Sequence, residues 1–252
     1  MRIGIIGAGR LGTVFARALS KEHEVLITDR DMDIVKKLSI DTGVKPIKNI
    51  SDMTGLEMVI VAVKPAAVGE VISSLKDAPL IVCAAAGLPI RKLESFGSRN
   101  IIRIMPNIAA EVNEAVIAYS FHSEIEHKEK VFLTAFSSLG VCIKVDESHI
   151  DPITALSGSG PAFIAYFAQA MVDEAIAQGL HPNIALKAVA QTLIGTGKLM
   201  LHGYDTKKVI DTVASPGGTT EAGLKMLDQK GVKGAIRDAV NFSTQKAREI
   251  GK

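Results

Sequence analysis

The first part of the chain alternates short, almost wholly apolar runs with segments in which apolar residues recur at helical spacing. Continuously apolar runs are typical of parallel strands that helices cover on both faces. Strands are expected over residues 2–6, 24–28, 58–63, 80–84, 101–104 and 141–145. Helices are expected between them, over residues 10–19, 31–38 and 66–75. This βαβ alternation predicts an α/β fold with a doubly wound parallel sheet.

Beyond residue 148 only helical periodicity remains. Helices are expected over residues 161–178, 182–201, 220–229 and 232–249. We therefore predict two domains, residues 1–148 for cofactor binding and an all-helical domain over residues 149–252. The long helices carry few charges and are more apolar than a small domain can bury alone. A homo-oligomer built through the second domain is expected.

Composition excludes several classes of partner. The 29 basic and 27 acidic residues are interspersed, the net charge is +2, and tryptophan is absent, which argues against nucleic-acid and membrane-surface binding. Cys83 and Cys142 lie in apolar runs, as core thiols do in a reducing compartment. The first strand leaves no room for a signal peptide, and the apolar run over 161–172 is too short to span a bilayer. A soluble, cytoplasmic protein is expected.

A glycine-rich loop follows the first predicted strand and opens the first helix. Gly7 permits the tight turn, Gly9 lets backbone approach a pyrophosphate, and Gly12 allows the helix to pack closely on the strand. The helix N-terminus then favours phosphate binding, and this context is the one that dinucleotide binding requires. The loop predicts a Rossmann-like domain. Its predicted cofactor-binding residues are Gly7, Ala8, Gly9, Arg10, Leu11 and Gly12.

Two adjacent residues after the second strand favour different cofactors. Asp29 is placed to accept hydrogen bonds from the ribose hydroxyls of NAD, although it could instead cap the helix beginning near Met32. Arg30 could pair with the 2′-phosphate of NADP. The sequence therefore leaves both NADPH and NADH open.

Further cofactor contacts are expected where later strands end, because ligands bind at the carboxyl ends of strands in open α/β sheets. Small residues at the end of the 80–84 strand let backbone approach a nicotinamide or ribose, or else serve only a turn needed for packing. The expected residues are Ala62, Val63, Lys64, Pro65, Ala86 and Gly87.

Three later segments distinguish one kind of dehydrogenase from another, namely residues 103–107, 151–162 and 213–223. The third contains consecutive glycines just before a helix. Its exposed N–H groups and hydroxyls would form a receptor for a small anion, such as a carboxylate. The alternative is an ordinary helix start with Thr219 or Thr220 as its cap. The six histidines have no metal-ligand spacing, so no metal site is expected.

The sequences Thr-Ala-Leu-Ser-Gly-Ser-Gly-Pro-Ala at 154–162 and Ser-Pro-Gly-Gly-Thr-Thr at 215–220 closely resemble the pyrroline-5-carboxylate reductase family, and the likeness covers essentially the whole chain. The resemblance implies a Rossmann domain followed by a helical dimerisation domain with interlaced helices, in dimers that can assemble further. It also implies hydride transfer from NADPH or NADH to the C=N bond of 1-pyrroline-5-carboxylate, which gives L-proline in the last step of proline biosynthesis.

The resemblance and the turn together assign the substrate residues. Ser215, Gly217, Gly218 and Thr219 are expected to hold the substrate carboxylate, and Thr220 to hydrogen bond to the ring nitrogen as the catalytic residue. The amide of Asn107 is expected to orient the nicotinamide or the reacting ring.

One departure from the family pattern lies beside Asn107. Family members usually continue Met-Pro-Asn with Thr-Pro-Ala, whereas this chain has Ile108-Ala109-Ala110. The change removes a hydroxyl and a rigid proline, so it bears on the contacts expected there and on the substrate.

Other readings of the sequence remain. One is a reductase of a related cyclic imine. Another is a short β-hydroxy acid dehydrogenase, which would need a catalytic lysine on the helix over 161–178, where there is none. The third is an NAD(P)-binding sensor or assembly protein without turnover. The intact 215–220 turn argues against that third reading, while Ile108 and Ala109 keep it open.

Overall fold

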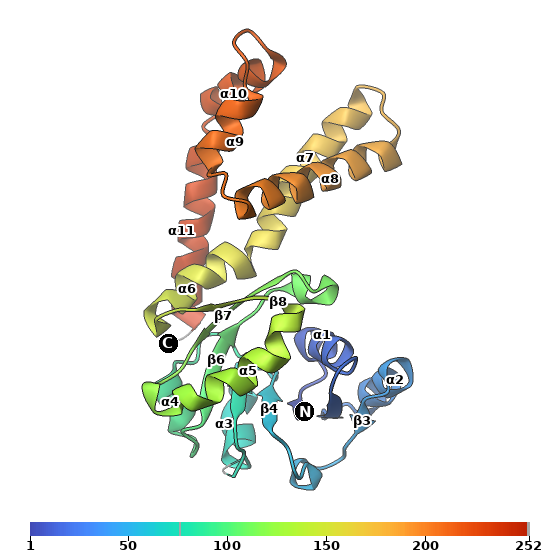
Figure 1. The fold of residues 1–252 in the computed structure, drawn as a ribbon, viewed down its shortest axis with the longest axis vertical. Coiled ribbons are helices and arrows are strands. Elements are labelled where there is room, and N and C mark those ends of the chain that lie inside the picture. The colour runs from blue at the N-terminus through green and yellow to red at the C-terminus, as the bar shows by residue number, and fades with distance from the viewer. Residues whose placement is uncertain (76, 251–252) are drawn as a thin grey trace. The chain divides into compact units, whose positions relative to one another are not determined.

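The structure is a computed structural model that describes residues 1–75 and 77–250 (Figure 1). It divides into two compact units. The sheet unit comprises Met1–Pro161 and Phe242–Lys252, and the helical unit comprises Ala162–Asn241. The domain boundary predicted after residue 148 stays a prediction.

One eight-stranded sheet organises the sheet unit, in the order β3-β2-β1-β4-β5-β6-β7-β8. Every neighbouring pair is parallel except β6 with β7. The order reverses direction at β1, so the predicted doubly wound, parallel-dominated sheet is confirmed. The strands are β1 Arg2–Ile6, β2 Glu24–Thr28, β3 Lys45–Pro46, β4 Met58–Val61, β5 Ile81–Cys83, β6 Ile101–Met105, β7 Ala115–Ser120 and β8 Gly140–Lys144.

Two of these strands were not predicted. β3 has only two residues, too few to show a pattern. β7 is antiparallel to β6, with Arg103 opposite Ser120. A parallel crossover needs a connection of a dozen residues or more, and the chain between β6 and β7 is shorter than that. The short connection therefore turns β7 back along β6.

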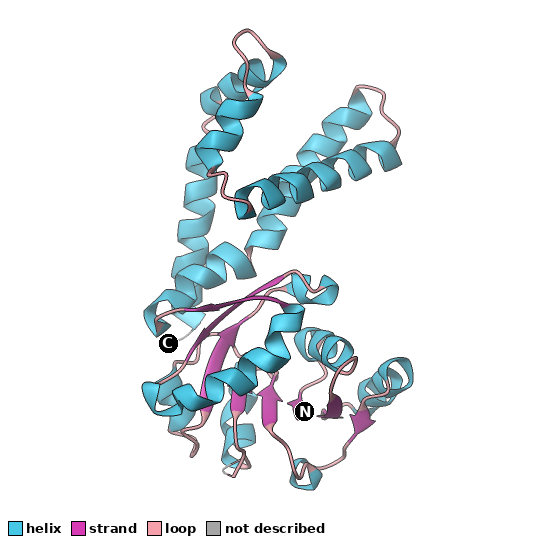
Figure 2. Cartoon of the chain, in the orientation of Figure 1, coloured by secondary structure: helices cyan, strands magenta, loops and turns pink. Residues whose placement is uncertain are grey.

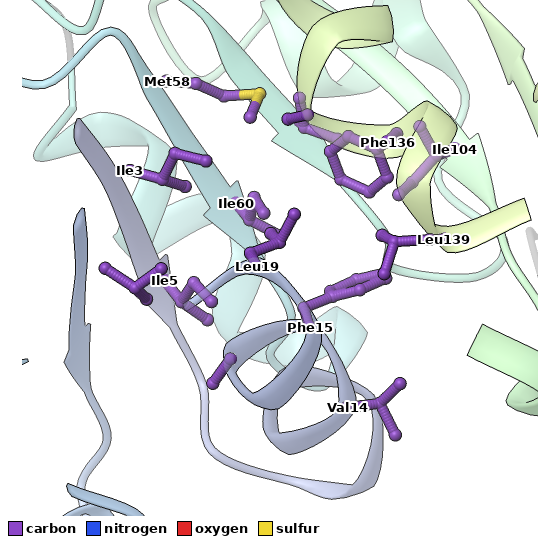
Figure 3. Packing of buried hydrophobic residues seen from close by; sticks show 14 of the residues in the cluster. Ile3, Ile5, Val14, Phe15, Leu19, Met58, Ile60, Ile104, Phe136 and Leu139 are labelled. Atoms are coloured by element: carbon purple, nitrogen blue, oxygen red, sulfur yellow. The ribbon is translucent and has the colours of Figure 1, made fainter. Parts of the chain in front are cut away.

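Helices cover both faces of the sheet (Figure 2). On one face, Phe15 packs edge-on against Phe136 with ring centroids 5.4 Å apart, over Ile60 and its neighbours (Figure 3). On the other face, Val68 and Ile72 pack against β4 and β5. The α-helices of this unit are α1 Arg10–Leu19, α2 Met32–Thr42, α3 Pro65–Ser73, α4 Ile90–Glu94, α5 Glu129–Phe136 and α6 Ile150–Ile153. Of these, α4, α5 and α6 were not predicted.

Shorter turns of helix join these elements. A π-helical turn, η6 Thr154–Gly158, follows α6 directly. The 3₁₀ turns are η1 Ile50–Asp52, η2 Ile108–Val112, η3 Ser123–Lys128, η4 Ser137–Leu139 and η5 Glu147–His149.

After β8 the described chain to residue 250 contains helices and turns but no strand, as predicted (Figure 2). Its long elements are α7 Gly160–Ala177, α8 Pro182–Leu201, α9 Thr206–Val213, α10 Thr219–Gln229 and α11 Val232–Ile250. Only α9 was not predicted. α7 begins in the sheet unit and α11 ends there.

The helical unit buries few of its apolar side chains. Val172, Ala185 and Val189 form a small core between α7 and α8. By contrast, Tyr166 and Leu201 are each more than four-fifths exposed. α8 is long and apolar enough to cross a membrane by length and composition alone. A single helix of this kind is weak evidence for a membrane span, because a helix that packs against a protein partner has the same composition.

Candidate functional site

The carboxyl ends of β2, β1, β4, β5 and β6 lie side by side along one edge of the sheet, because these five strands are parallel neighbours. This edge includes the point where the strand order reverses, which is where dinucleotides bind in such sheets. Every predicted cofactor residue follows one of these strand ends, so the fold brings them to one edge. In sheet order they are Asp29 and Arg30, then 7–12, then 62–65, then Ala86 and Gly87, then Asn107.

The glycine-rich loop has the geometry that a pyrophosphate requires. Gly7 adopts φ +106°, and a side-chain Cβ there would lie 2.6 Å from the carbonyl oxygen of Ala62. A Cβ at Gly12 would lie 1.9 Å from the carbonyl oxygen of Gly7. At Gly9, the N-cap of α1, a Cβ would meet nothing within 4 Å, and no side chain caps the helix. The open, uncapped N-terminus of α1 therefore fits an anionic group.

Asp29 joins the end of β2 to this loop. Its Oδ2 accepts a hydrogen bond from the N–H of Ala8 at 2.6 Å, and its Oδ1 accepts one from the N–H of Asp31 at 2.9 Å. The cap of α2 is Asp31, whose carboxylate accepts from Asp33 and Ile34. The alternative role of Asp29 as the cap of α2 is therefore wrong.

Arg30 is a solvated cation beside the same strand end. Its guanidinium lies 3.0 Å from the carboxylate of Glu70, and both side chains are more than three-quarters exposed. Exposed pairs of this kind contribute about 0–1 kcal/mol. Arg30 can therefore leave Glu70 at little cost and pair with another anion.

The ends of β4 and β5 complete the edge. Ala62 donates its N–H to Ile6 at 2.8 Å, and Lys64 is the exposed N-cap of α3, with Pro65 in the first turn. Gly87 adopts φ +78°, a left-handed conformation that favours glycine. Ala86 packs with Met105, which supports the packing alternative for this turn. The cofactor contacts assigned to these residues stay predictions.

Asn107, after β6, uses its side chain inside the protein. Its Nδ2 donates to the carbonyl oxygen of Ser157 at 3.1 Å, and its Oδ1 accepts from the N–H of Val116 at 3.4 Å. The next residue, Ile108, begins η2 with a side chain 40% exposed. The predicted contact of Asn107 with nicotinamide or substrate stays a prediction.

The predicted carboxylate turn lies in the helical unit. α10 begins at Thr219 with Gly218 as its N-cap and no side-chain cap, so neither Thr219 nor Thr220 caps the helix as the alternative supposed. Gly217 adopts φ +71°, and the N–H of Gly218 donates to the carbonyl oxygen of Ser215 at 3.0 Å. Thr219 is exposed and Thr220 is half-buried. The turn presents backbone N–H groups at an uncapped helix start, which suits a small anion.

Glu221 is a further partner in this turn, beyond the residues that the sequence predicted. Its Oε2 accepts a hydrogen bond from the N–H of Gly217 at 2.7 Å. A glutamate three residues after an N-cap commonly reaches back to the backbone in this way, so the spacing alone could have revealed the contact. In this structure the carboxylate of Glu221 therefore occupies the N–H of Gly217, which the sequence predicted to bind the substrate carboxylate.

Arg103, on β6, was also missed as an organising residue. It is buried, and its guanidinium lies 3.0 Å from Glu147 and 3.9 Å from Asp151. Glu147 also accepts from the N–H of Ile90 at 2.6 Å, so the pair ties the sheet to the starts of α4 and η5. These contacts have a structural purpose.

The sheet unit offers neither a reactive thiol at Cys83 nor, among its described residues, a metal site. Burial raises the pKa of the Cys83 thiol to about 11, so it is neutral near pH 7 and a poor nucleophile. Within residues 1–75 and 77–250, no group of three or more His, Cys, Asp or Glu side chains could hold a metal ion.

Comparisons with known proteins agree along the whole chain. Residues 147–250 match the family model described as pyrroline-5-carboxylate reductase dimerisation. Residues 2–87 match the model described as NADP oxidoreductase, coenzyme F420-dependent. The first match covers the elements from η5 to α11, and the second covers β1 to β5.

Full-length relatives give the same result. The pyrroline-5-carboxylate reductase of Aquifex aeolicus is 33% identical over 99% of this chain and 97% of its own length. That of Methanosarcina acetivorans is 34% identical over 100% of this chain and 98% of its own length. The crystal structure of Plasmodium falciparum pyrroline carboxylate reductase with NADP bound superposes with a TM-score of 0.86 at 25% identity, covering 100% of this chain and 98% of that one. This chain therefore belongs to the pyrroline-5-carboxylate reductase family.

Proposed function

We propose that this protein reduces 1-pyrroline-5-carboxylate to L-proline with NADPH or NADH, the last step of proline biosynthesis. The observation that carries the proposal is the pairing of an open dinucleotide edge with an intact Ser-Pro-Gly-Gly-Thr-Thr turn in one chain of this family. The turn is the more specific of the two, because glycine-rich loops occur in many dehydrogenases.

The sheet edge would hold the dinucleotide through backbone and a few charges. The first turn of α1, open above Gly9, offers N–H groups to the pyrophosphate. Asp29 favours an unphosphorylated ribose, and Arg30 favours a 2′-phosphate. Bound reduced nicotinamide supplies a hydride. Backbone at Ala86 and Gly87 would flank its ring, because small residues let the ring approach closely.

The turn before α10 would hold the substrate. Ser215, Gly217, Gly218 and Thr219 would bind the carboxylate, while the hydroxyl of Thr220 would hydrogen bond to the ring nitrogen. Protonation of that nitrogen makes the neighbouring carbon electrophilic, so hydride addition there yields the secondary amine without a protein nucleophile. The protein's contribution is orientation and electrostatics.

We also propose a homodimer, or an assembly of dimers, formed through the helical unit. The support is the exposed apolar surface of that unit, including Tyr166 and Leu201, together with the family match over residues 147–250. A cytoplasmic location is consistent with the free thiols of Cys83 and Cys142. Molar mass by light scattering at micromolar protein would show at least twice the chain mass of 26.7 kDa.

The test follows the nicotinamide absorbance band with purified protein, pyrroline-5-carboxylate, and NADPH or NADH in parallel. Substrate-dependent loss of absorbance with formation of proline is the expected result. The matched control is Thr220→Ser, which keeps the hydroxyl, beside Thr220→Ala, which removes it. Thr220→Ala with undiminished catalytic efficiency would contradict the role assigned to Thr220.

Two other outcomes would point elsewhere. A folded protein that binds the dinucleotide but reduces only a different cyclic imine would be a related reductase. One that binds it and reduces no imine would be a sensor or assembly protein. In either case the departure at Ile108 and Ala109 would be the first position to restore to the family's Thr-Pro pair.

A further inference from the structure

The hydrogen bonds of Asn107 give its side chain a specific task. Nδ2 donates to the carbonyl of Ser157, and Oδ1 accepts from the N–H of Val116, at 3.1 and 3.4 Å. Since a carbonyl only accepts and a backbone N–H only donates, these partners fix which end of the amide is which. Asn107 is also the N-cap of η2, yet its side chain does not cap that turn. Asparagine is among the best capping residues, so the distant bonds have displaced the local one.

The carbonyl of Ser157 needs a hydrogen-bond donor from outside its own helix, because Pro161 stands four residues later. In an α-helix that carbonyl would accept from the N–H of residue 161, but Pro161 has no N–H. A proline ring also clashes with the carbonyl four residues before it. The helix widens here into the π-helical turn η6, and Ser159 donates to the carbonyl of Thr154, five residues back, at 2.9 Å. The proline thus accounts for the free carbonyl of Ser157 that Asn107 satisfies, just where the π turn ends and α7 begins.

The same bond ties that turn to the cofactor edge of the sheet. Asn107 lies two residues after the end of β6. Met105, the last residue of β6, packs against Ile150 and Ile153 of α6. Ser157 itself is buried. A buried acceptor that loses its donor is costly, so the conformation after β6 and the π turn depend on each other.

We propose that Asn107 is a positioning residue: its amide supplies the donor that Pro161 withholds from the carbonyl of Ser157, and so fixes the loop after β6 against the π turn. The proposal rests on the proposed function for its effect on the reaction. Asn107 then acts on hydride transfer through Ser157, without a hydrogen bond of its own to nicotinamide or substrate.

A double-variant cycle tests this. Pro161→Ala gives residue 161 an N–H that can donate to the carbonyl of Ser157 in the ordinary helical way. In the natural background, Asn107→Ala is expected to lower kcat about 10-fold with little change in the KM of the dinucleotide, and to lower the unfolding midpoint in denaturant. In the Pro161→Ala background, Asn107→Ala should lower kcat by less than about threefold. It should also lower the unfolding midpoint by less than it does in the natural background.

Two control variants separate positioning from general destabilisation. Asn107→Asp keeps the shape and the acceptor for Val116 but lacks the donor, so it should lose at least as much kcat as Asn107→Ala. Ser243→Ala removes the hydroxyl contact of 3.1 Å with Ser159 beside the same π turn. It should lower the unfolding midpoint and leave kcat within about twofold, because the Asn107 bond is intact.

If Asn107→Ala lowers kcat equally in the two backgrounds, the proposal is overturned and Asn107 has a direct contact with a ligand. Unchanged kcat and stability in Asn107→Ala would overturn it as well. If Asn107→Ala does not fold, Asn107→Ser replaces it, since a serine hydroxyl is too short to reach Ser157 from the same position. The unfolding arm needs no substrate, so it decides the Ser157 contact even if the reductase assay fails.

Discussion

The backbone N–H of Ala8 donates to the carboxylate of Asp29 across 2.6 Å, which joins the glycine-rich loop to the end of β2. The residue that the sequence predicts to select the cofactor ribose therefore also holds the loop that is predicted to bind the pyrophosphate. Substitution of Asp29 should affect cofactor choice and loop stability together.

Asp29→Asn keeps the size of the side chain, removes its charge, and can no longer serve both N–H groups as a carboxylate does. Without the negative charge, a 2′-phosphate is repelled less. We expect the ratio of kcat/KM for NADPH over NADH to rise about 10-fold, and the unfolding free energy to fall by about 1–2 kcal/mol. Steady-state kinetics with both cofactors and urea unfolding would measure the two effects. An unchanged ratio would exclude Asp29 from cofactor selection.

Arg30→Ala should have the opposite selectivity. The guanidinium is exposed and pairs with exposed Glu70, so its loss should change the unfolding free energy by less than about 1 kcal/mol. Catalytic efficiency with NADPH should fall about 10-fold and that with NADH should stay within about twofold, because only NADPH carries the 2′-phosphate. Glu70→Gln is the matched control, as it frees Arg30 without removing it. Equal losses with both cofactors would contradict this role.

The sequence predicted well which strand ends lie side by side along one edge of the sheet, because that prediction needs only local information. Each strand of the parallel part is an apolar run, and parallel strands place their carboxyl ends at one edge whatever their lengths. The loop from Gly7 to Gly12 adds a local steric requirement that the structure meets at both glycines. Neither inference depends on knowing which residues meet across long stretches of chain.

The features that could not be predicted depend on contacts between residues far apart in the sequence. Asn107 contacts a carbonyl 50 residues later in the chain, and Glu147 neutralises an arginine 44 residues before it. No periodicity or short motif encodes a partner at that separation. The antiparallel direction of β7 could not be predicted for a related reason, since it follows from the length of a connection and not from the strand's own residues. The sequence could name the candidate residues more readily than their contacts.

Glu147→Ala should be strongly destabilising. The side chain of Arg103 is 6% exposed, and without Glu147 it would keep the longer contact with Asp151 at 3.9 Å. Removing one partner of a buried pair typically costs about 3–5 kcal/mol, and the partial exposure of Glu147 places this case near 3. Glu70→Ala, which breaks an exposed pair, should cost less than about 1 kcal/mol. Guanidinium unfolding of both variants would measure the difference, and similar costs would show that the Arg103 pair contributes little.

Cys83 should make the protein less stable at alkaline pH. Burial raises the pKa of its thiol from 9.0 to about 11, so the unfolded chain ionises before the folded one. The stabilisation is fully present below pH 9 and is lost as the pH rises to 11, about 3 kcal/mol in all. Cys83→Ala should flatten this part of the pH dependence. Unfolding free energies of both proteins at pH 8 and 11 would test it, and parallel curves would contradict the assignment.

Glu221 offers the sharpest test of the substrate turn. Its carboxylate takes the N–H of Gly217 at 2.7 Å, so an anionic substrate must share or displace it. Glu221→Gln keeps the size of the side chain and removes the charge. This change should lower the KM of pyrroline-5-carboxylate about fivefold, since two like charges about 4 Å apart repel by about 1 kcal/mol in water. The cost to α10 should be no more than about 1 kcal/mol, from the lost interaction with the helix dipole. Glu174→Gln, on exposed α7, is the matched control and should leave KM unchanged. If both variants keep the KM of the unaltered protein, the substrate carboxylate does not bind at the N–H of Gly217.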